Sequence, residues 1–106
     1  MIFIGETLDV KLLTFEDFAG RVNESFSLSL GESTVDMVLT AARPLSKFAY
    51  GGMLRAPFDL LFNSSSPIVL PQRIYPLSND AMGRIDIFIV PVARNKDGIV
   101  YQAVFN

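Results

Sequence analysis

Alternation between apolar and polar residues is the main pattern along this chain. Phe26, Leu28 and Leu30 alternate with serines, and a second alternating stretch runs over 34–41, after Gly31-Glu32-Ser33. A period of two is typical of strands that bury one face. The short turn between the two stretches predicts that they pair in an antiparallel hairpin.

Four more strands are expected, over 58–63, 72–77, 84–92 and 99–105. Because Pro71 and Pro76 cannot donate to a strand ladder, the segment 72–77 should lie at a sheet edge or beside a bulge. The turn Asn95-Lys96-Asp97-Gly98 predicts a hairpin, with Gly98 free to adopt positive φ. The last two strands should therefore be adjacent.

The segment 84–92 is the most apolar of the six. Ile85, Ile87 and Ile89 fall on one face, and Phe88, Val90 and Val92 fall on the other. Apolar residues on both faces predict burial on both faces. Asp86 shares the Phe88 side and is expected near the rim.

One short helix is expected near the N-terminus. Thr14 suits its N-cap, Glu16 and Asp17 complement the positive helix end, and Gly20 ends it. Phe15 and Phe18 should share a face and plug one end of a core. The fold class is therefore mainly β, an antiparallel sandwich or small barrel of about six strands with one short N-terminal helix.

The stretch 43–57 breaks this regular pattern, although it is rich in aromatic and aliphatic residues. Connections of this length are more often functional than idle, and such side chains are favoured at interface centres. We therefore select five candidate interface residues: Phe48, Tyr50, Met53, Leu54 and Arg55. The alternative is a loop folded back over the end of the sheet.

Composition adds a reason to expect a partner. The chain has 106 residues, enough for one domain, and 50% are hydrophobic, with a mean hydropathy of +0.36. A domain this small has too much surface to hide so many apolar side chains. We expect a protein partner or self-association to cover part of that surface.

Charge and segment lengths argue against other partners. The net charge is −2 and no two Lys or Arg residues are adjacent, which does not fit nucleic-acid binding. No apolar run approaches the roughly 20 residues of a membrane span, and we read no signal peptide at the N-terminus. The expected location is cytoplasmic, or within an assembled extracellular or tail-like structure.

Catalytic side chains are scarce. The chain has no His and no Cys, so we expect no enzyme activity, no metal and no cofactor. Carboxylates are the remaining option: Glu16 with Asp17, Asp80 with Asp86, and Asp97. We interpret the first pair as helix-start residues and the others as turn residues.

Several motifs resemble a family of uncharacterised bacterial domains. They are Leu13–Phe18, Pro57–Phe62, Leu70-Pro71-Gln72, Tyr75, Phe88–Val92 and the ending Tyr101–Asn106. The resemblance covers 13–106, read as a single domain, and leaves 1–12 as an N-terminal extension. The chain departs from the family pattern at Arg73, a position where we expect glycine.

The resemblance implies a functional setting through neighbouring genes, since such domains are often encoded beside phage-tail-collar proteins of the microcystin-dependent type. The leading hypothesis is a non-enzymatic binding or assembly module, in a phage-tail-like or surface-fibre system. The alternative is a small-molecule-binding β-barrel lined by strand aromatics. Those aromatics, which we expect to be core instead, are Phe58, Phe62, Tyr75, Phe88, Tyr101 and Phe105.

Overall fold

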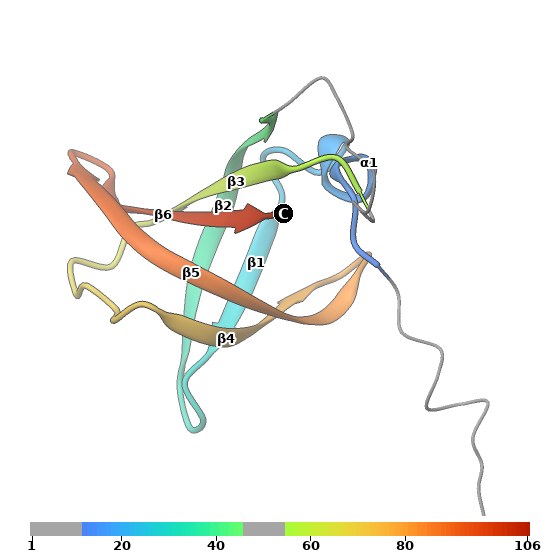
Figure 1. The fold of residues 1–106 in the computed structure, drawn as a ribbon. Helices are drawn as coiled ribbons and strands as arrows, with labels where there is room; N and C mark the ends of the chain where they lie inside the picture. The colour runs from blue at the N-terminus through green and yellow to red at the C-terminus, as the bar shows by residue number, and fades with distance from the viewer. Residues whose placement is uncertain (1–11, 46–54) are drawn as a thin grey trace, which may run out of the picture.

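A computed structural model describes residues 12–45 and 55–106, and these contain one helix and six strands (Figure 1). The helix α1 spans Phe15–Ala19, and the strands are β1 Ser25–Ser29, β2 Thr34–Pro44, β3 Phe58–Ser64, β4 Arg73–Asn79, β5 Gly83–Asn95 and β6 Gly98–Phe105. All six predicted strands and the predicted helix are confirmed. No helix in these two ranges is long and apolar enough to cross a membrane.

The strands close into one barrel in the order β1-β2-β3-β6-β5-β4, with every neighbouring pair antiparallel. The fold is thus a barrel and not a sandwich. It consists of two three-stranded meanders, β1-β2-β3 and β4-β5-β6, joined through β3–β6 and β1–β4. The central strand of each meander is the longest, and each has a register shift, at Leu39/Ala41 in β2 and at Pro91/Ala93 in β5. Bulges bend a strand and increase its twist. This allows β2 and β5 to follow the curvature of the barrel and to pair with a neighbouring strand on each side.

The expected edge position of β4 is wrong in part, because closure gives β4 a partner on each side. It pairs with β5 along its whole length, but with β1 only through Ser78 and Leu77. Pro76 comes directly before that short ladder, where a missing N–H breaks no bond to β1. Arg73 starts β4 without positive φ; Asn23 is the one non-glycine residue that has it in the described part of the chain.

Inward-facing side chains fill the barrel, and α1 plugs one end. Phe18 is fully buried, and its ring lies 5.9 Å from those of Phe58 and Phe105, which stack on each other at 4.6 Å. Phe15 contacts Phe58 edge-on at 6.4 Å. The predicted plug formed by Phe15 and Phe18 is confirmed.

The loop before β4 is held against the barrel by two tyrosine side chains. The Tyr101 hydroxyl accepts from the Leu70 amide at 3.0 Å, and the Tyr75 hydroxyl donates to the Pro71 carbonyl at 2.6 Å. Both tyrosines are buried. Their polar ends thus bond to loop backbone while their rings belong to the core.

Burial of β5 on both faces is contradicted. Ile87 and Ile89 point inward and are buried, but Phe88 is 50% exposed and Val92 is 48% exposed. A barrel has one inner face, so outward residues become buried only where a second layer covers them. Phe88 is therefore not a core aromatic, and Asp86 lies exposed on the same outer side as expected.

Candidate functional site

Four of the ten large apolar side chains that are exposed in the described residues lie on the outside of the second meander. Ile74 of β4 is 63% exposed and lies directly opposite Phe88 of β5 in the ladder. On β6, Val104 is 48% exposed and comes two residues after Gln102, the partner of Val90. Because side chains alternate between faces, Phe88 and Val104 both point outward. We call Ile74, Phe88, Val92 and Val104 the outer apolar surface.

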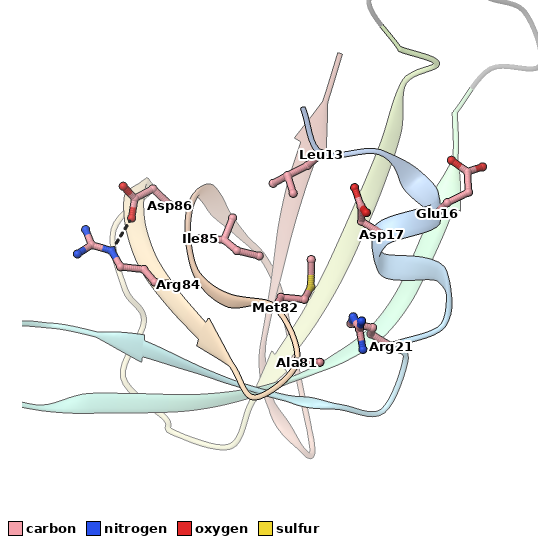
Figure 2. A pocket seen from close by; sticks show the side chains of 9 residues that line it. All are labelled: Leu13, Glu16, Asp17, Arg21, Ala81, Met82, Arg84, Ile85 and Asp86. Atoms are coloured by element: carbon pink, nitrogen blue, oxygen red, sulfur yellow. Dashed lines mark hydrogen bonds and ion pairs between the residues drawn. The ribbon is translucent and has the colours of Figure 1, made fainter. Parts of the chain in front are cut away.

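A hollow of about 600 Å³ lies beside this surface, between α1 and the start of β5 (Figure 2). Its apolar lining comes from Leu13, Met82 and Ile85. Its charged lining comes from Glu16, Asp17, Arg21, Arg84 and Asp86. The mixture of both signs gives the hollow no strong preference for an anion or a cation.

Several of these charged groups already have structural partners. The Asp17 carboxylate accepts from the Thr14 amide at 2.8 Å, as a helix-capping residue does. Arg84 donates to Asp86 at 3.1 Å, and Arg21 lies 3.6 Å from Glu24. The interpretation of Glu16 and Asp17 as helix-start residues is therefore confirmed by the first turn of α1, which contains both.

The other carboxylate candidates do not form an acid–base pair either. Asp80 lies in the turn between β4 and β5, which confirms its turn interpretation. The turn interpretation of Asp86 is wrong, because Asp86 lies within β5, where it points outward and accepts from Arg84. The Asp97 amide donates to Asn95 Oδ1 at 2.8 Å within the β5–β6 hairpin, which confirms the turn interpretation of Asp97. Within 12–45 and 55–106 no cluster of three acidic residues could hold a metal ion.

Of the five candidate interface residues, Phe48, Tyr50, Met53 and Leu54 lie outside the residues that the structure describes. Arg55 is described. Its guanidinium donates to the Leu13 and Asn106 carbonyls, at 2.7 and 3.1 Å, and lies 5.2 Å from the Phe105 ring. Arg55 thereby joins the chain before α1 to the end of β6 above the aromatic plug.

Asp59 is a buried carboxylate that sequence reasoning missed. Arg43 from β2 donates two hydrogen bonds to it, at 2.8 and 2.6 Å, and Gln102 from β6 donates a third at 2.7 Å. The Asp59 side chain is 1% exposed although it lies on the outer face of β3. Neither partner is close in sequence, so only the pairing of β3 with β2 and β6 brings them together.

These contacts shift the pKa of Asp59. The hydrogen bond from Arg43 holds the pKa of this carboxyl below its usual value, with help from Gln102 and against the opposing effect of burial. A lowered native pKa means that the folded state favours the charged form. The resulting stabilisation is complete above the unfolded pKa of about 4 and is lost as the pH falls through the lowered native pKa.

Asp59→Asn is therefore expected to lower the free energy of unfolding by about 2 kcal/mol at pH 7. The difference from the unmodified protein should shrink towards pH 3, because the unfolded carboxyl, which has the higher pKa, takes up its proton before the native one does. Urea unfolding at both pH values measures this. Asp36→Asn, on the exposed outer face of β2, is the control and should change stability by less than about 0.5 kcal/mol. An Asp59→Asn deficit that is equal at both pH values would contradict the assigned role.

Comparison with known proteins identifies a family over most of the chain. Residues 13–105 match the family described as Domain of unknown function (DUF6916). No curated protein and no solved structure matches significantly. The match agrees with the resemblance to an uncharacterised domain family noted from the sequence motifs. From Leu13 through the end of β6, then, this chain is a member of the DUF6916 family of domains of unknown function.

Proposed function

We propose that this domain is a non-enzymatic binding or assembly module that contacts protein through its outer apolar surface. The observation that carries the proposal is the exposed cross-strand pair of Ile74 and Phe88. Surface strands of a solvated barrel usually carry polar residues outward, so an exposed aromatic facing an exposed isoleucine is costly unless it is covered. Aromatic side chains are also the commonest energetic centres of protein interfaces.

A second copy of the chain is the simplest protein partner. The resemblance noted in the sequence further suggests a setting in a phage-tail-like or surface-fibre assembly, where repeated copies or unlike subunits pack side by side. The candidate loop residues Phe48, Tyr50, Met53 and Leu54 stay predicted contacts in this proposal. The outer apolar surface is the contact region that the described residues support.

The alternative of a small-molecule carrier needs space inside the barrel. Buried side chains from all six strands and from α1 form one core there. The hollow beside α1 lies at the barrel end, and a second, of about 610 Å³, lies at the β5–β6 hairpin. This packing favours a protein-binding role over a ligand held within the barrel.

Phe88→Asp is expected to weaken self-association at least about tenfold while leaving the fold intact, because it places a charge in the centre of the contact. Sedimentation velocity across a concentration series measures association, and urea unfolding checks the fold. Val38→Asp is the matched control, since Val38 is 38% exposed on the outer face of β2, across the barrel. Tyr50→Asp and Leu54→Asp in the same series test the loop.

If the Phe88→Asp and Val38→Asp variants associate equally strongly, the domain does not self-associate through the outer apolar surface. An unmodified protein that stays monomeric at millimolar concentration would overturn self-association altogether.

A further inference from the structure

We propose that the outer apolar surface receives the segment Ile2-Phe3-Ile4 of a second copy as an added strand along β5. This inference rests on the proposed function and names the partner and the mode of contact. Strand addition uses main-chain hydrogen bonds for affinity and outward side chains for specificity.

The first requirement is a strand edge without a partner. β5 pairs with β4 over Gly83–Ile89, but it pairs with β6 only from Val90 onward. The second edge of Gly83–Ile89 therefore has no partner strand among 12–45 and 55–106. β5 and β6 diverge towards the end that α1 plugs, as Figure 1 shows. Unpaired edge groups of this kind are a template for another chain.

The second requirement is an apolar contact beside that edge. Phe88 lies on the unpaired part of β5, with Ile74 across the ladder on one side. On the other side, Val104 lies on the part of β6 that β5 no longer pairs with. A strand entering between β5 and β6 would thus lie next to Phe88 and Val104, the side chains that are now about half exposed.

The third requirement is an occupant of matching character. Residues 1–11 lie outside the described part of the chain, and they include Ile2, Phe3 and Ile4 in direct succession. Isoleucine and phenylalanine favour strands. The family match begins at residue 13, so the segment lies outside the part of the chain that the family model covers.

The segment is long enough to reach a second copy. Leu13 lines the hollow together with Ile85, at the start of the unpaired edge. Ile4 is nine residues earlier and, extended at about 3.3 Å per residue, reaches about 30 Å from Leu13. The unpaired edge has seven residues and, at the same rise, spans about 23 Å. A fully extended segment can therefore pass beyond its own edge, and the self-association proposed above makes a second copy the partner to which we assign Ile2-Phe3-Ile4.

Engineered cysteines test this contact in the full chain, which contains no native cysteine. A Phe3→Cys variant and a size-tagged Phe88→Cys variant are mixed, oxidised mildly and separated on a non-reducing gel. We expect the disulfide-linked heterodimer to form at least about fivefold more than with a tagged Thr34→Cys variant, because contact raises the local thiol concentration. Thr34 is exposed on β2, across the barrel.

Equal heterodimer yields with Phe88→Cys and Thr34→Cys would overturn the inference. So would a double Phe3→Cys/Phe88→Cys variant that gives only internally linked monomer, since the segment would then occupy its own barrel. The proposed function fails separately, through the Phe88→Asp association measurement. If the Phe88→Asp variant loses association and no Phe3–Phe88 disulfide forms, the outer apolar surface is still a contact surface. The segment Ile2-Phe3-Ile4 is then not what binds to it.

Discussion

Gly98→Ala is expected to lower the free energy of unfolding by about 4 kcal/mol, a large part of the roughly 5–15 kcal/mol that stabilises a typical domain. Two effects add at this position. Gly98 has φ of +126°, a conformation that side-chain-bearing residues rarely adopt. A Cβ there would also collide with the backbone of Ser64, and it would lie 2.9 Å from the Cα of Ser65. Backbone atoms of the paired strand cannot move aside as a flexible side chain could.

Gly31→Ala separates the two effects. Gly31 also has positive φ, +94°, but nothing lies within 4 Å of an added Cβ. Only the conformational cost remains there, about 1–2 kcal/mol. Urea unfolding of both variants measures the difference. If the two alanine variants lose equal stability, β6 and the end of β3 do not approach each other as closely as the barrel requires.

Phe58→Ala is expected to cost about 4 kcal/mol, within the range for removing a buried phenylalanine. Phe58 is fully buried and its ring contacts those of Phe15, Phe18 and Phe105. Its loss would leave a cavity between α1 and the barrel end and would remove the stacking partner of Phe105. Thermal and urea unfolding measure the loss, and amide exchange of α1 should rise more than that of β1.

Phe88→Ala is the matched control, because it removes the same side chain from the half-exposed outer face of β5. It should cost less than about 1 kcal/mol, since half of the ring is already in water. A similar loss of stability for the two variants would mean that the barrel has a second layer over β5. Such a result would also remove the basis for an exposed contact surface.

Strands, turns and the helix were predictable from local pattern. The alternation of serines with Phe26 and Leu28 is visible without any knowledge of neighbours, as are the Asn95–Gly98 hairpin and the capping residues around Thr14. Each depends on residues within about four positions of one another, so short-range sequence contains the whole signal. Even the plug of Phe15 and Phe18 follows from their spacing on one helical turn.

The candidate contact surface could not be predicted in the same way. The sequence pattern placed Phe88 in the core because both faces of its strand are apolar. The same pattern occurs in a strand that is buried on both faces and in a strand whose outer apolar face is exposed. Closure of six strands into one barrel decides between them, since it leaves the outer face of β5 in water.

The apolar–polar alternation and the composition alone determined a mostly β domain with a helix at its start. They also showed that it has no histidine or cysteine and a high proportion of apolar residues for a domain of this size. The tertiary structure decided where those residues lie and which polar group is buried. Asp59 is 16 residues from Arg43 and 43 from Gln102, so its burial depends on two strand pairings at once. The exposed positions of Ile74, Phe88, Val92 and Val104 on β4, β5 and β6 have the same physical reason: the inside or outside of a strand is fixed only when its neighbours close the sheet.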